Sequence, residues 1–108
     1  MVAEDLTTLL DEIESLLREP SAGGAAAVAR IEQTLTDGYA RALALEGRRW
    51  RLERQITDVG RLLAGGDENR AAELTALYGR LSETEADLSK LRGALAELRR
   101  HANAVRAA

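Results

Sequence analysis

The side chains that could support catalysis or hold a metal are few in this sequence. His101 is the single histidine, Glu97 precedes it by four residues, and cysteine is absent. On a helix this spacing places a glutamate and a histidine on one face, which di-metal helical bundles require. Such bundles also need glutamates that point inward from facing helices, and the apolar stripes of this sequence contain none. We therefore expect no catalytic residue, no metal and no cofactor, and a protein that is not an enzyme.

The most basic stretch of the sequence, Arg48–Arg54, could bind phosphates. Four arginines there surround Trp50, the single tryptophan, and arginines with an aromatic side chain can bind nucleic-acid backbones and bases. Against this interpretation, the chain carries 18 acidic and 15 basic residues, and on a helix these arginines would face different directions. Arginine also supplies 14 of the 15 basic residues, which is typical of a GC-rich genome and weakens the signal. Nucleic-acid binding is therefore the alternative function and not the first one.

Two acids, Asp67 and Glu68, follow a pair of glycines between two long helical patterns. An antiparallel helical hairpin with acids at its tip resembles, in outline, the hairpin of Gre-type factors that enters the secondary channel of RNA polymerase. This resemblance would imply a transcription-associated role for the hairpin tip. The structural interpretation is that the acids lie at the N-terminus of the next helix, where negative charge is favourable and Asp67 or Asn69 could serve as the cap.

Composition restricts the fold that positions these side chains. The 108 residues include 18 leucines and 20 alanines but only three aromatic residues, which is too few to fill a β-sandwich core. The longest apolar run, Ala25–Ala29, is too short to cross a membrane, and the acidic N-terminus has no apolar signal segment. We therefore expect an all-α, cytoplasmic protein with no membrane partner.

Apolar spacing predicts three helices in a single helical domain. Leucines and isoleucines three and four residues apart indicate a short amphipathic first helix, while strict alternation over five heptads is typical of a coiled coil. A loop of a few residues between the two long helices requires them to be antiparallel. The expected elements of the domain (1–108) are a helix at about 4–18, a linker at 19–24, a helix at about 25–64, a tight loop at 65–67 and a helix at about 68–106.

The register of the two long helices follows from matching their apolar positions. When Val59 is placed opposite Leu74, every further layer pairs one residue of the second helix with one residue of the third, and no layer is out of register. Small residues then face large ones, and the single arginine of the seam faces its single threonine. The predicted pairs are Val59–Leu74, Ile56–Leu77, Leu52–Leu81, Arg49–Thr84, Leu45–Leu88, Ala42–Leu91, Gly38–Leu95, Leu35–Leu98, Ile31–Ala102 and Val28–Val105.

Charged side chains flank this seam and predict ion pairs. Arg49 lies in the layer between Glu46 and Glu85, whose charges would otherwise repel, so we expect it to bridge them, with Glu53 one turn further along. A buried charge of this kind would fix the register, because a slipped helix would leave it unpaired. The other flanking pairs expected are Glu32–Arg99, Tyr39–Arg92 and Arg48–Asp87.

Leu43 and Trp50 lie seven residues apart on the outer face of the second helix, with Gly47 between them. An exposed tryptophan near a leucine indicates a contact surface. Three occupants remain open. They are the first helix, which we expect to cover 31–42 and 91–102 but which could pack further along, a second copy of the chain, and an unidentified protein partner.

These features favour a non-catalytic structural or protein–protein interaction module, a coiled-coil adaptor that forms a homodimer through Leu43, Gly47 and Trp50. The alternative is a nucleic-acid- or transcription-associated factor. It would use the basic stretch Arg48–Arg54 or the acidic hairpin tip, Asp67 and Glu68.

Overall fold

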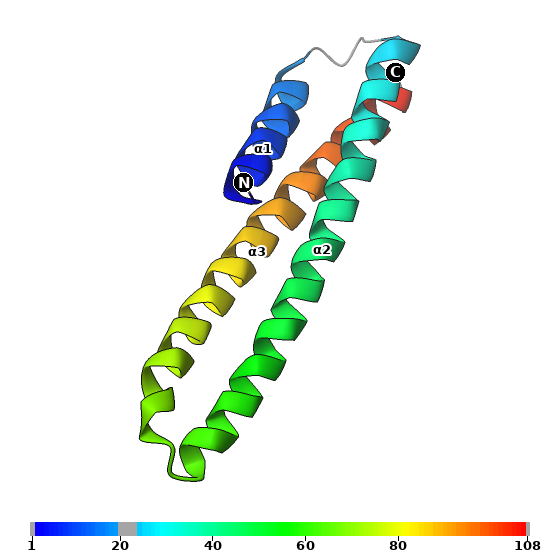
Figure 1. Cartoon of the computed structure of the whole chain (residues 1–108). Helices are drawn as coiled ribbons and strands as arrows, with labels where there is room; N and C mark the ends of the chain where they lie inside the picture. The colour runs from blue at the N-terminus through cyan, green and yellow to red at the C-terminus, as the bar shows by residue number, and fades with distance from the viewer. Residues whose placement is uncertain (1, 20–23, 108) are drawn as a thin grey trace. The chain divides into compact units, whose positions relative to one another are not determined.

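The computed structural model describes residues 2–19 and 24–107, and for residues 2–5 the backbone alone. The described residues form helices and no strand, which confirms the predicted all-α fold with a short N-terminal helix packed on a long helix pair. The elements are α1 (Val2–Arg18), α2 (Ala25–Ala64), a 3₁₀ turn η1 (Glu68–Arg70) and α3 (Ala71–Ala107) (Figure 1). Dimerisation stays a prediction.

The chain divides into two compact units. Unit 1 comprises Met1–Leu43 and Ser89–Ala108, and so contains α1, the first part of α2 and the last part of α3. Unit 2 is the continuous segment Ala44–Leu88, with the rest of α2, the turn and the start of α3. Each unit has its own buried side chains.

In unit 1, α1 packs its apolar stripe against the two longer helices. Ile13 is 1% exposed, and polar contacts hold the helix at its edge. The hydroxyl of Thr34 donates a hydrogen bond to Glu12 at 3.3 Å, and the Arg30 guanidinium donates two bonds to the carboxylate of Glu19, at 3.1 and 2.9 Å. The buried apolar residues of this unit are Leu6, Ile13, Leu16, Ile31, Leu35, Leu91, Leu95, Leu98, Ala102 and Val105.

A close approach between α2 and α3 occurs at Gly38. A Cβ atom built on this glycine would lie 2.3 Å from Leu95 Cδ2 and 3.3 Å from Leu95 Cγ. Only a residue without a side chain leaves room for the leucine there. The predicted pairing of Gly38 with Leu95 is therefore confirmed.

The core of unit 2 has the composition that the predicted register requires. Leu52, Val59 and Leu77 are buried together, and Ile56, Leu74 and Leu81 pack against them half-buried. These six residues are the members of three predicted pairs, Val59–Leu74, Ile56–Leu77 and Leu52–Leu81. Ile56, Leu74 and Leu81 are more exposed because two helices form this core and no third helix of the unit covers it.

α2 ends in a Schellman motif at the turn that connects it to α3. The backbone N–H of Asp67 donates to the Leu62 carbonyl and that of Gly66 donates to the Leu63 carbonyl, both at 3.1 Å. Gly66 has φ +104°, a left-handed conformation that glycine adopts without strain. Asp67 precedes η1 without a side-chain capping bond, and Asn69 lies inside η1, so neither residue is the side-chain cap expected from the sequence.

The flanking pairs of unit 1 differ from the expected ones by one heptad. Both Nε and Nη2 of Arg99 lie 3.4 Å from the Tyr39 hydroxyl, and Glu32 forms an ion pair with Arg106. These contacts differ from the expected Tyr39–Arg92 and Glu32–Arg99 pairs. The reason is that Cα–Cβ bonds tilt toward the N-terminus of their helix. In this antiparallel pair, the tilt brings together side chains that lie one heptad further along α3.

Candidate functional site

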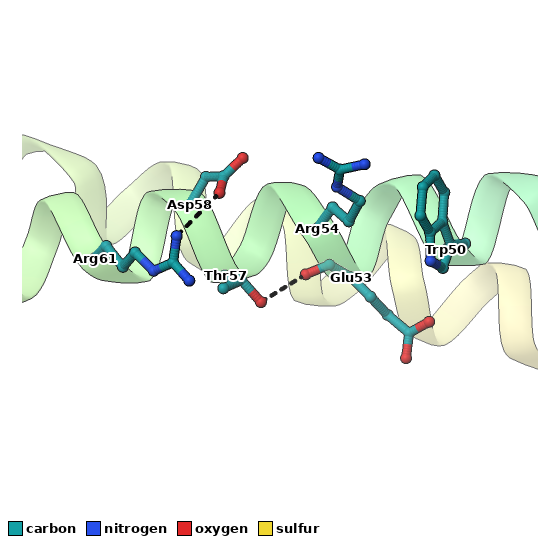
Figure 2. Close-up of a pocket in the computed structure, with 6 residues that line it drawn as sticks. All are labelled: Trp50, Glu53, Arg54, Thr57, Asp58 and Arg61. Atoms are coloured by element: carbon teal, nitrogen blue, oxygen red, sulfur yellow. Dashed lines mark hydrogen bonds and ion pairs between the residues drawn. The ribbon is translucent and has the colours of Figure 1, made fainter.

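Trp50 is the largest apolar side chain that unit 2 leaves in solvent. It lies on the outer surface of α2 and is 58% exposed. The guanidinium carbon of Arg54, one turn along, lies 4.9 Å from the centre of its ring (Figure 2). A cation–π contact at an exposed site is worth about 0.5–1 kcal/mol, which orients the indole while much of it stays accessible to solvent.

The surface next to Trp50 is a shallow hollow of about 430 Å³ along α2. The hydroxyl of Thr57 donates to the backbone carbonyl of Glu53 at 3.1 Å, and Asp58 lies 4.0 Å from Arg61 (Figure 2). One helix supplies all the lining residues, so the hollow is an open surface with charges of both signs. Its lining residues are Trp50, Glu53, Arg54, Thr57, Asp58 and Arg61.

Leu43, which the sequence analysis grouped with Trp50, belongs to unit 1 and is 74% exposed. Leu43 is therefore not covered by α1, which belongs to the same unit. Gly47 is half-buried, and a Cβ atom there would lie 3.4 Å from Arg51 Nη1. A methyl group at this position would therefore make ordinary van der Waals contact with the Arg51 side chain.

Arg49 forms its ion pairs along α2. Its Nη2 lies 3.7 Å from Glu46 and its Nε lies 3.9 Å from Glu53. Glu85 is exposed, and no ion pair within the described residues joins it to Arg49, so the expected bridge between the helices is absent. Positions three before and four after Arg49 are its neighbours on the same helix. The Arg49 side chain is 36% exposed, so this cluster is not buried.

A second hollow of unit 2 is lined by three arginines. Arg48 and Arg51 of α2 and Arg80 of α3 surround about 310 Å³, with Leu52 and Gln55 as the other lining residues. No carboxylate lines it. Arg48 is half-buried, and the expected Arg48–Asp87 ion pair is not formed among the described residues. Sequence reasoning missed Arg80, although its position beside Gln55 follows from the same register that pairs Leu52 with Leu81.

The acids of the hairpin tip are partly neutralised. Asp67 accepts a hydrogen bond from Arg70 Nε at 3.1 Å, and Arg70 Nη1 donates to Glu73 at 2.8 Å. The carboxylates of Glu73 and then Asp67 raise the pKa of Arg70 above its ordinary value, so it stays charged at any accessible pH. Glu68 is exposed. The tip therefore presents one unpaired acid, Glu68, beside an ion-pair network.

The remaining candidate, His101 with Glu97, lies in α3 of unit 1. His101 is half-buried and Glu97 is exposed. Within residues 2–19 and 24–107, no three histidine, aspartate or glutamate side chains gather closely enough to hold a metal ion. In that same part of the chain, no helix has the length and apolar character needed to span a bilayer.

Comparisons with protein-family models, with curated proteins and with solved structures found no match to this chain.

Proposed function

We propose that this protein is a non-catalytic interaction module that self-associates through the outer surface of α2 around Trp50. The observation that carries the proposal is the 58% exposure of this tryptophan. An indole buries about 150–250 Å² when fully covered, so a partner that covers the exposed part would remove roughly 100 Å² per copy. At about 25 cal/mol per Å², this is about 2–3 kcal/mol for each tryptophan.

A second copy of the chain is the occupant that the surrounding charges favour. Glu53, Arg54, Asp58 and Arg61 place both signs along the same hollow. A surface with mixed charges can pair with its own copy about a two-fold axis, because each sign then meets its opposite. A strongly one-signed surface would instead favour a partner of opposite charge.

The test is the molar mass across a range of protein concentrations, measured by light scattering or sedimentation equilibrium. We expect the native chain to form dimers and Trp50→Glu to be monomeric. The matched control is Tyr78→Glu, because Tyr78 is also aromatic, belongs to unit 2 and is 55% exposed, but lies on α3. This control should remain dimeric. Leu43→Glu, measured separately, reports whether a residue of unit 1 also contributes.

The fluorescence of Trp50 provides an independent readout, because it is the single tryptophan. Its emission should shift to longer wavelength as the dimer dissociates on dilution. A native chain that stays monomeric with unchanged emission at high concentration would contradict self-association. A Trp50→Glu variant that still forms dimers would place the interface elsewhere.

A further inference from the structure

We infer that the hollow formed by Arg48, Arg51 and Arg80 is a binding site for a compact oxyanion that carries two adjacent phosphate groups. The site is formed by two consecutive turns of α2 and one residue of α3, all within unit 2. Guanidinium groups bind phosphate through paired, charge-assisted hydrogen bonds. Gln55 adds an amide that can donate two more, and the buried Leu52 closes the floor.

The three arginines lack acidic partners within the described part of the chain. Two acids, Asp58 and Glu73, line the neighbouring hollow together with Arg80, and both are paired with other arginines. Asp58 lies beside Arg61, and Glu73 accepts a hydrogen bond from Arg70. Three positive charges around one hollow repel each other, and an anion bound there would remove that repulsion.

The contrast with Arg49 supports this assignment. Arg49 lies on the same turn as Arg48 but has two carboxylates within 4.0 Å. Three guanidinium groups that surround one hollow without carboxylate partners are what an anion site requires.

The surroundings favour a compact anion over a long polyanion. Unit 2 contains nine acidic and seven basic residues, so a nucleic-acid strand that extends past the hollow would meet negative charge. A volume of about 310 Å³ is at the lower end of small-ligand sites. A diphosphate group, free or at the end of a small molecule, fits both conditions because it concentrates its charge on the arginines.

The test is titration calorimetry of the full chain with pyrophosphate at low ionic strength, with inorganic phosphate, adenosine triphosphate and a single-stranded DNA oligonucleotide as comparison ligands. We expect saturable binding of pyrophosphate that is tighter than that of phosphate. Loss of one charge-assisted interaction in Arg80→Gln or Arg51→Gln should weaken the Kd about tenfold. Adenosine triphosphate binding as tightly as pyrophosphate would identify a nucleotide as a possible source of the diphosphate, and weaker binding would favour a free diphosphate.

The matched control is Arg100→Gln, because Arg100 is an exposed arginine of α3 that lines neither this hollow nor the one beside Trp50. It should leave the Kd unchanged, and circular dichroism should show the native helix content in all three variants because all three arginines are exposed. Absence of saturation at about 10 mM pyrophosphate would overturn the inference, since this concentration exceeds even a millimolar Kd. Equal weakening by Arg100→Gln, or tighter binding of DNA than of pyrophosphate, would also overturn it.

Discussion

The two units share the same pair of long helices, yet they bury their apolar side chains to different degrees. Among the described residues, unit 1 has ten buried apolar residues and unit 2 has five. Ile13, Leu35, Leu91 and Leu98 of unit 1 are almost completely enclosed. The difference follows from α1, which adds a third helical surface to unit 1, whereas two helices alone leave a seam that is open on both sides.

This difference also determines where candidate sites occur. In unit 1, the polar residues next to the core are engaged in holding helices together, as Thr34 and Glu12 do. In unit 2 the flanks of the seam face solvent, and they carry Trp50 and the three unpaired arginines. The helix pair without a third helix therefore carries both hollows that are proposed as binding surfaces, while Leu43 is an exposed apolar residue of unit 1.

The largest difference between the two units is expected when one core leucine of each is replaced by alanine. Leu98→Ala should lower the free energy of unfolding by about 3–5 kcal/mol, because Leu98 is 0% exposed and leaves a cavity. Leu74→Ala in the half-buried seam of unit 2 should cost about 1–2 kcal/mol. Urea unfolding followed by circular dichroism measures both values.

Trp50 fluorescence sharpens the same experiment, because it reports unit 2 specifically. If the two units unfold together, fluorescence and circular dichroism will give coincident transitions in Leu98→Ala. Equal costs for the two truncations would contradict the comparison, since they would mean that α1 adds no burial to the core of unit 1.

Replacing either of two glycines of unit 1 by alanine should change the free energy of unfolding by a smaller amount, with opposite signs for the two positions. Gly38→Ala should destabilise the protein by about 1–2 kcal/mol, since the new methyl group would displace the buried Leu95. Gly93→Ala should stabilise it by about 0.5–1 kcal/mol, because its added Cβ would meet nothing within 4 Å and alanine is the better helix former. Thermal unfolding distinguishes the two signs.

The double variant Gly38→Ala with Leu95→Ala is the control for this interpretation. The alanine at position 38 would fill part of the space vacated by Leu95, so the double variant should be more stable than the sum of the single effects predicts. Simple additivity would mean that the two residues are not in contact.

The sequence was sufficient for the helices and for the residues that form their shared core, because both depend on apolar spacing. Gly38 meets Leu95 as predicted, and the six core residues of unit 2 are those of three predicted pairs. Long charged side chains are different, because their ends lie several ångströms from the backbone and their direction depends on the tilt of Cβ and on competing partners. Tyr39 therefore pairs with Arg99, one heptad beyond the residue expected.

The candidate sites were predictable only in part for the same reason. The exposure of Trp50 followed from its place on the outer face of a helix, and its 58% exposure agrees with that placement. The arginine hollow was missed because it needs residues from both helices and depends on which arginines find acids. Asp67 was expected to cap a helix, but the side chain of Arg70 engages its carboxylate instead.

The smallest effect, and the finest test of the open seam in unit 2, concerns Arg49. The side chains of its two ion pairs are 32–55% exposed, and the pairs lie at 3.7 and 3.9 Å, so removing them should cost little. Leucine at this position would extend the apolar seam opposite Thr84, which already satisfies its hydroxyl by donating to the Arg80 carbonyl at 2.9 Å. We therefore expect Arg49→Leu to raise the free energy of unfolding by about 0.5–1 kcal/mol, as replacement of an ion pair by apolar side chains often does.

Arg49→Leu also tests whether Arg49 fixes the register of α2 against α3, separately from its effect on stability. Glu46 and Glu53 lie on the same helix as Arg49, so a slipped α2 would carry all three residues together and keep their ion pairs. The cluster therefore exerts little penalty against a slip, and the packing of large residues against small ones must define the register instead. Cysteines introduced at Leu52 and Leu81 should cross-link equally fast with and without Arg49→Leu, while cysteines at Leu52 and Leu88 should not cross-link in either background. A 52–88 cross-link that forms only in Arg49→Leu would show that the arginine fixes the register, because the apolar pairs would then tolerate a shift of one heptad.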